Sequence, residues 1–271
     1  MAGSLEDDMF EAAPVVVPVR RPSHIVHTLP TAIWLARTLG TTIDVLTVLD
    51  PDDDRSFEER ELTAALADAT RGADVGVDFR VIVAESVADG FVAHCSGRLV
   101  CMTTSADPFD HGHYVGSHAA ALLEVSDAPV VLVGPSADAD CIEHVTDIVV
   151  AISSDSDSKS ILPHARWMAG ACGVPMSTVR IDVEAGTVYE SHYEAAGLGP
   201  PDSIRATLRS TPVEAGDISS SLVDRSNTAI LAVATHARRG LVWLAEGSVA
   251  FDSIAKATTP VLAVGPNVRL V

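Results

Sequence analysis

The sequence predicts an α/β protein made of two similar halves in tandem. Two similar twenty-residue segments align without a gap: GSHAAALLEVSDAPVVLVGP at 116–135 and GSVAFDSIAKATTPVLAVGP at 247–266. A second pair, LPTAIWLARTLG at 29–40 and LPHARWMAGACG at 162–173, lies at nearly the same offset. Apolar runs of strand length alternate with helix-compatible stretches throughout. The repetition indicates a duplicated unit, and the alternation predicts parallel strands with helices on both faces of a sheet.

The first half supplies five strands and the helices between them. The β-branched run at 15–19 predicts a buried strand. The helix at 29–40 has Pro30 in its first turn and Gly40 as its stop. Further strands are predicted at 41–50, 77–84, 98–104 and 129–133, and further helices at 57–72, at 85–97 and after Gly116.

The second half follows the same plan less regularly. Strands are predicted at 148–152, 177–183, 212–214, 229–235 and 261–264, and helices at 162–172, near 203–209, at 217–225 and after Gly247. The stretch 184–202 is the least regular part of the chain. We place two domains at 10–136 and 145–271, and the segment between them has the composition of a linker.

Composition excludes several classes of function. The net charge of −19 argues against nucleic acid and against an anionic membrane surface, since both need basic patches. The apolar runs fall short of the ~20 residues of a spanning helix, and the acidic amino terminus lacks the features of a signal peptide. The four cysteines show no paired metal spacing. We therefore expect a cytoplasmic protein. Its acidic, lysine-poor surface has two explanations, adaptation to salt or a GC-rich genome.

The stretch at 235–266, THARRGLVWLAEGSVAFDSIAKATTPVLAVGP, resembles the universal stress proteins. The whole chain, apart from its amino terminus and linker, resembles a tandem universal stress protein. The resemblance implies two doubly wound five-stranded parallel sheets of strand order 3-2-1-4-5, each with helices on both faces. It also implies that the two halves pair through their fifth strands, because an apolar edge strand must be covered, and that the tandem chain forms a homodimer.

The resemblance further implies an adenine nucleotide, ATP accompanied by Mg, in the second half. The family pattern is glycine, two residues, glycine, nine residues, then glycine and serine or threonine, with an aspartate after the first strand. Gly247 and Ser248 match its end, where free N–H groups of a helix favour phosphate. Alanine replaces the two earlier glycines, and serine stands at the aspartate position. The candidate nucleotide-binding residues are Ser153, Asp155, Thr235, His236, Ala237, Arg238, Arg239, Gly247 and Ser248.

The first half retains less of the pattern, and its weaker second site consists of Arg20, Ala106, Gly116 and Ser117. Arg20 stands where the family has its aspartate. Two loops that we expect to face this crevice also carry histidines and aspartates, namely His24, His27, Asp107, Asp110, His111 and His113. These side chains suit either a transition metal or a lattice of arginine–aspartate pairs that closes a disused site. We favour the lattice and expect no metal.

Catalysis has little support, since the chain lacks a nucleophile elbow and a phosphate-binding P-loop. The sequence therefore predicts a stress-responsive regulator that binds a small molecule and is not an enzyme. The alternative is an interaction scaffold that binds no nucleotide and acts through dimerisation. Slow ATP hydrolysis is a third, weaker hypothesis.

Overall fold

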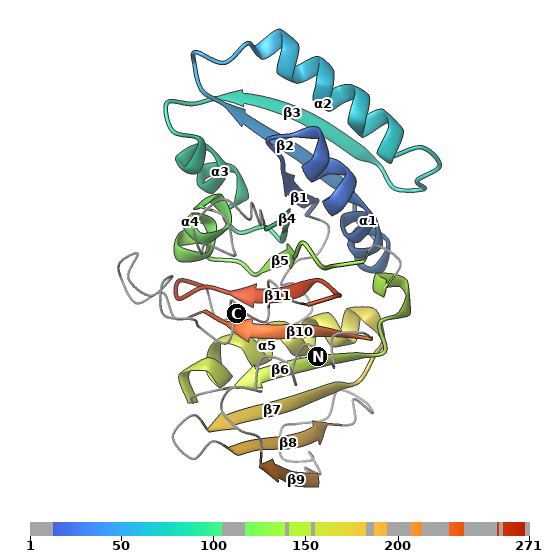
Figure 1. The fold of residues 1–271 in the computed structure, drawn as a ribbon, viewed down its shortest axis with the longest axis vertical. Coiled ribbons are helices and arrows are strands. Elements are labelled where there is room, and N and C mark those ends of the chain that lie inside the picture. Colours follow the sequence, from blue (N-terminus) through green and yellow to red (C-terminus); the bar gives the residue numbers. More distant parts are fainter. Residues whose placement is uncertain are drawn as a thin grey trace, which may run out of the picture.

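A single mixed sheet runs through the length of the protein (Figure 1). The structure, a computed structural model, describes residues 13–104, 117–138, 141–152, 155–182, 187–193, 207–212, 228–235, 254 and 257–268. Within these residues the sheet has eleven strands in the order β3-β2-β1-β4-β5-β11-β10-β6-β7-β8-β9. The sequence predicted two five-stranded parallel sheets that meet through their fifth strands. In the structure the halves share one sheet, because the hydrogen-bonding edge of β5 (Val130–Val133) is filled by β11 (Val261–Val264). The prediction of a wholly parallel five-stranded sheet in the second half is corrected, since β8 and β9 join that half antiparallel.

The first half is a doubly wound parallel sheet with the strand order 3-2-1-4-5. All of its strand pairs are parallel. In chain order its elements are β1 (Val15–Pro18), α1 (Pro22–Leu39), β2 (Ile43–Leu49), α2 (Arg55–Ala69), β3 (Val77–Val83), α3 (Val87–Cys95), β4 (Val100–Thr103), α4 (Ser117–Val125) and β5.

The sequence predicted that the first helix begins at residue 29. In the structure, helix α1 begins at Pro22. Pro22 fits the first turn because a proline there needs no N–H partner. Pro30 consequently lies inside the helix. Burial of Ile25 adds a turn of apolar contact with the sheet, which favours the earlier start. Gly40 ends the helix in the left-handed conformation, with φ of 63°.

The second half begins parallel and ends antiparallel. After the short helix η1 (Cys141–His144) come β6 (Asp147–Ile152), α5 (Asp155–Cys172), β7 (Met176–Asp182), β8 (Thr187–Tyr193), β9 (Thr207–Pro212), β10 (Ala229–Ala234) and β11. Strand β6 pairs in parallel with β7 and β10, and β10 with β11. Strands β8 and β9 instead extend the sheet as an antiparallel meander.

This meander corrects one expectation. Residues 207–209, predicted as helix, belong to β9. Of the strand predicted at 212–214, Pro212 is the last residue of β9, and residues 213 and 214 lie outside the described residues. The helical prediction rested on local propensity, which pairing with β8 overrides. The helix predicted at 217–225 lies outside the described residues.

The junction between the halves is reciprocal. Val131 of β5 faces Leu262 of β11 in an antiparallel pair. A Cβ on Gly134, just after β5, would lie 2.5 Å from the carbonyl oxygen of Ile254, and a Cβ on Gly265 would lie 1.8 Å from that of Leu123. In the repeated segment Gly134 corresponds to Gly265, and Leu123 to Ile254. Each half therefore packs a helical backbone carbonyl against the glycine that follows the other half's last strand.

The two faces of the sheet carry separate cores. Helices α1, α2 and α5 pack on one face, through side chains such as Leu29, Leu62 and Ile161. Helices α3 and α4 pack on the other, through Phe91 and Leu122. Within the described residues, no helix is long and apolar enough to cross a membrane.

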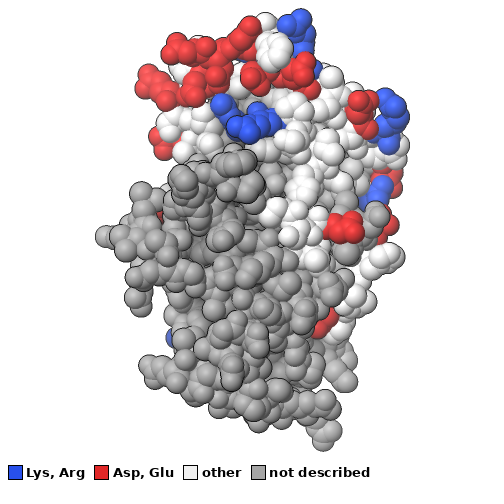
Figure 2. Space-filling view, viewed as in Figure 1, with Lys and Arg blue, Asp and Glu red and all other residues white. Residues whose placement is uncertain are grey.

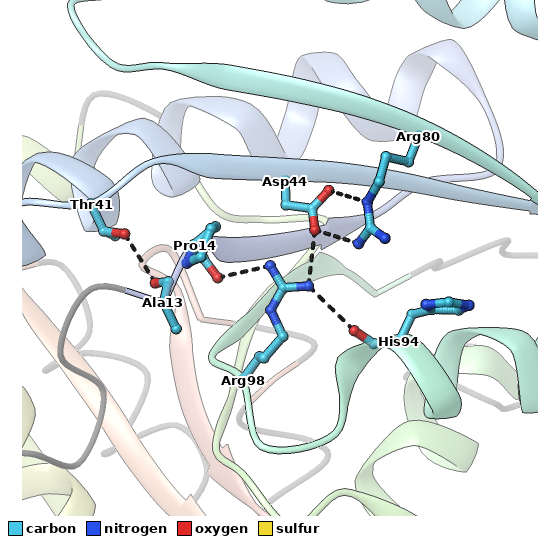
Figure 3. A network of polar contacts seen from close by, with 7 residues as sticks. All are labelled: Ala13, Pro14, Thr41, Asp44, Arg80, His94 and Arg98. Atoms are coloured by element: carbon cyan, nitrogen blue, oxygen red, sulfur yellow. Dashed lines mark hydrogen bonds and ion pairs between the residues drawn. The ribbon is translucent and has the colours of Figure 1, made fainter.

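A buried carboxylate, that of Asp44, links neighbouring strands through two partly exposed arginines (Figure 3). Asp44 in β2 accepts hydrogen bonds from Nε of Arg80, at 2.8 Å, and from Nη1 of Arg98, at 2.9 Å. Arg98 also contacts the carbonyl oxygens of Pro14 and His94, both at 3.5 Å. The cluster joins β1, β2, β3 and the end of α3. Burial alone would raise the pKa of Asp44, but the hydrogen bonds from the two arginines outweigh burial and lower it.

Acidic side chains gather at the end of the molecule formed by α2 (Figure 2). Helix α2 is capped by Asp54, whose carboxylate accepts hydrogen bonds from the backbone N–H of Ser56 and Phe57. Its exposed face alternates acidic residues with arginines and includes the i,i+4 pair Arg55–Glu59, at 3.7 Å. The charged side chains keep this surface in contact with water, and exposed ion pairs of this kind contribute little to the free energy of unfolding.

Candidate functional site

The strand order reverses at two places in the sheet, and both mark candidate ligand crevices. In the first half, the strands that follow β1 and β4 in the chain add to the sheet on opposite sides of these two neighbours. In the second half the same holds for β6 and β10. Ligands of open α/β sheets bind beyond the carboxyl ends of strands at such points. This rule therefore places one candidate crevice after Pro18 and Thr103, and another after Ile152 and Ala234.

The first crevice contains a small pocket. It is lined by Pro18, Val19, Arg20, His24, Phe91, Met102, Thr103, His118 and Ala119. These residues come from the ends of β1 and β4, the first turns of α1 and α4, and helix α3. The space open to the centres of water molecules is about 30 Å³, room for about two waters. Pockets that bury organic ligands are much larger, on the order of 300–1,000 Å³.

Arg20 bridges this crevice to β2. Its Nη1 donates a hydrogen bond to the carbonyl oxygen of Val48 and lies 3.4 Å from a carboxylate oxygen of Asp53. Asp53 also accepts a hydrogen bond from the backbone N–H of Asp50, at 2.9 Å. A carboxylate at position 20 could accept from ligand hydroxyls, whereas this guanidinium only donates and is already held by protein acceptors.

Two histidines from different helices share the pocket. His24 stands in the first turn of α1, and its Nδ1 accepts a hydrogen bond from the backbone N–H of Arg20, at 3.3 Å. His118 stands at the start of α4, with its ring edge-on to Phe91 at a centroid distance of 6.1 Å. Desolvation by burial lowers the pKa of His24. The positive groups around it act in the same direction; in order of effect they are Arg21, His118, Arg20 and His27. The pKa of His118 is also lowered, mainly by desolvation through burial and secondly by the positive charge of Arg20.

His27, which the sequence placed near this crevice, is used elsewhere. Its Nε2–H donates to the carbonyl oxygen of Gly134, at 2.8 Å, and so ties α1 to the end of β5. Of the side chains considered for a metal, Asp107, Asp110, His111 and His113 lie outside the described residues. Among the residues that are described, no group of three or more histidine, cysteine, aspartate or glutamate side chains could hold a metal ion.

The structure describes few of the residues that the sequence proposed for the nucleotide. Thr235 is buried, and its hydroxyl donates to the carbonyl oxygen of Val264, at 3.1 Å. Thr104 makes the corresponding contact with Val133 in the first half, at 3.4 Å. Both threonines thus fasten the ends of neighbouring strands. Asp155 begins α5 and Ser117 begins α4. The other candidates, Ser153, His236, Ala237, Arg238, Arg239, Gly247, Ser248, Ala106 and Gly116, lie outside the described residues.

Sequence reasoning missed part of the pocket lining. Phe91 and Met102 read as ordinary core residues, and nothing in their spacing links them to Arg20. His118 offered a signal, since it directly follows Ser117 at the start of the repeated segment, where the second half has Val249. The difference between the two copies at this position marks a residue specific to the first crevice.

Comparison with known proteins identifies the fold. No protein-family model matches the chain, and no match was found among curated proteins. A universal stress protein from Archaeoglobus fulgidus DSM 4304 aligns with a TM-score of 0.63 at 13% identity, over 95% of this chain and 98% of that one. A functionally unknown protein from Pseudomonas aeruginosa PAO1 aligns with a TM-score of 0.56 at 15% identity, over 95% and 93%. The chain therefore has an α/β fold of the kind found in universal stress proteins.

Proposed function

We propose that this chain is a stress-responsive binding protein of the universal stress protein type, built as a tandem of domains at 10–136 and 145–271. The fold and its coverage of a similarly folded chain support this proposal. So do the reciprocal contacts of Gly134 with Ile254 and of Gly265 with Leu123, since two copies of one unit meeting face to face would make each contact twice.

In this proposal the two crevices differ, and an adenine nucleotide, ATP with Mg, binds only in the second half. One observation carries the asymmetry: Arg20 spans the carboxyl end of β1 and is held by Val48 and Asp53. The residual pocket there has room for about two waters. The second crevice has serine at the position of Arg20. Its ligand contacts come from Ser153, Asp155 and the helix that the sequence predicts after Gly247, while Thr235 positions the end of β10.

In this proposal the ligand chemistry follows from the amino terminus of the helix predicted after Gly247, next to a switch point. Backbone N–H groups and the helix dipole favour phosphate there, and Arg238 and Arg239 add charge for the remaining phosphates. Gly247 permits close approach of the backbone to the ligand. We assign binding rather than catalysis to this crevice, and Mg accompanies the nucleotide.

Isothermal titration of the full chain with Mg·ATP tests the proposal. We expect one site per chain, a loss of at least about tenfold in affinity in Gly247→Val, and unchanged affinity in the matched variant Gly116→Val. The denaturation midpoints of both variants establish that they are folded. Equal losses in the two variants would contradict the asymmetry. Absence of binding by the folded wild-type chain would contradict the nucleotide and favour the interaction scaffold.

A further inference from the structure

The turn between β1 and α1 is held by the side chain of His24, which can accept its hydrogen bond only when the ring is uncharged. Nδ1 of His24 accepts the backbone N–H of Arg20, at 3.3 Å. A protonated Nδ1 is a donor and cannot accept this bond. Arg21, the residue at the amino-terminal cap of α1, makes no side-chain cap bond. Neutral His24 is therefore the side chain that satisfies a backbone donor at this turn.

The surroundings of His24 disfavour a proton from every described direction. From its own segment it faces Arg20, Arg21 and His27, and from α4 it faces His118. The pocket residues from α3 and β4 are Phe91, Met102 and Thr103, all uncharged. No carboxylate is among the described residues that line the pocket, and the nearby Asp53 is paired with Arg20. The positive end of the α1 dipole adds to the repulsion.

We propose that His24 is a pH-sensitive latch whose protonation releases the turn between β1 and α1 and opens the first crevice. Protonation removes the acceptor for the N–H of Arg20 and places a positive charge beside its guanidinium. The same guanidinium ties the turn to β2 through Val48 and Asp53. In this proposal, loss of the His24 bond frees the backbone of Arg20 and also loosens the contacts of its guanidinium with Val48 and Asp53. In this role the first half responds to protons and needs no nucleotide.

The direction of the effect follows from the titration of His24. Its pKa in the folded chain lies below the ordinary value of 6.5, mainly through desolvation by burial. The unfolded chain consequently binds a proton more readily than the folded one. The stability that neutral His24 contributes is complete above about pH 6.5. This stability begins to be lost as the pH falls below that value, and the loss is complete once the pH has fallen below the lowered pKa of His24 in the folded chain.

Nuclear magnetic resonance of the ¹⁵N-labelled full chain tests the latch. The ring nitrogens of His24 and the backbone amide of Arg20 are followed from pH 7.5 to 4.5. We expect His24 to titrate below 6.5 and the exchange protection of the Arg20 amide to fall about fivefold with the same midpoint, as for one lost hydrogen bond. An Arg20 amide that stays unchanged through the titration of His24 would overturn the proposal.

Matched variants separate the latch from a general effect of acid. Glutamine at position 24 keeps an acceptor and cannot be protonated in this range, so in His24→Gln the Arg20 amide should lose its pH response. His144→Gln changes an exposed histidine of η1 and should leave that response intact. A response that persists in folded His24→Gln would refute the assignment to His24. If that variant does not fold, the wild-type titration decides.

Discussion

Alanine at Gly265 should break the junction between the two halves of the sheet. The Cβ that this substitution adds would lie 1.8 Å from the carbonyl oxygen of Leu123 in α4. Real Cβ contacts stay beyond 3.0 Å, so the backbone after β11 or helix α4 must move by more than about 1 Å. The obstacle is a backbone atom, which has no rotamer to change. Because Gly265 directly follows β11, this movement strains the pairing of β11 with β5.

The expected cost lies at the upper end of the range for overpacking, about 3 kcal/mol in the free energy of unfolding. For a chain of this size that corresponds to a fall of roughly 6–12 °C in Tm. Gly134→Ala creates the milder contact of 2.5 Å with Ile254. It should therefore cost less, about 1–2 kcal/mol.

Urea unfolding of the purified chains, followed by circular dichroism, measures these differences. Gly170 is the matched control, since it lies exposed in α5 with nothing within 4 Å of the added Cβ. Gly170→Ala should stabilise the chain by about 0.5–1 kcal/mol through helix propensity. The expected order of stability is Gly170→Ala, wild type, Gly134→Ala and Gly265→Ala. If Gly265→Ala matched the wild type within about 0.5 kcal/mol, the reciprocal junction would be refuted.

Three further predictions concern charge and cysteine chemistry. Asp44→Asn should lower the free energy of unfolding at pH 7 by about 2 kcal/mol, less than for a fully buried pair because Arg80 is 42% exposed. This difference from the wild type should shrink as the pH falls below about 4 and through the lowered pKa of Asp44, and equal stability at pH 7 would contradict it. Burial raises the pKa of the Cys95 thiol to about 12 and also raises that of Cys101. Both should therefore resist iodoacetamide at pH 7.5 until the chain unfolds, and rapid alkylation of the native protein, seen by peptide mass, would contradict their burial. The Tm should rise with KCl and level off above about 0.3 M, where screening is largely complete; a continued rise to 3 M would instead indicate adaptation to salt.

The first half of the fold could be predicted closely from the sequence. Strands there are β-branched runs such as 15–19, and the helices between them have local stops such as Gly40, so neighbouring residues carry the information. The start of α1 was missed because Pro30 looked like a first-turn proline. Burial of Ile25 against the sheet, a tertiary contact, extends the helix back to Pro22.

The candidate site was less predictable, since its contacts join distant parts of the chain. Arg20 was singled out by its position, but its partners Val48 and Asp53 come from β2 and the turn after it. His24 and His118 share a pocket because β1 and β4 are neighbours in the sheet. The spacing of residues along the chain does not encode that neighbourhood.

The sequence by itself determined the duplicated unit, the alternation of strand and helix, and the glycines at matching places after the last strand of each copy. The alternation is a local pattern fixed by residues a few positions apart, and the duplication and the matching glycines are found by comparing the chain with itself. Only the tertiary structure decided the antiparallel register of β5 and β11, which joins the halves into one sheet, and the antiparallel turn-back of β8 and β9. It also decided that Arg20 is held by β2. The physical reason is that strand pairing and side-chain capture depend on which edges and acceptors remain free once every other element has packed.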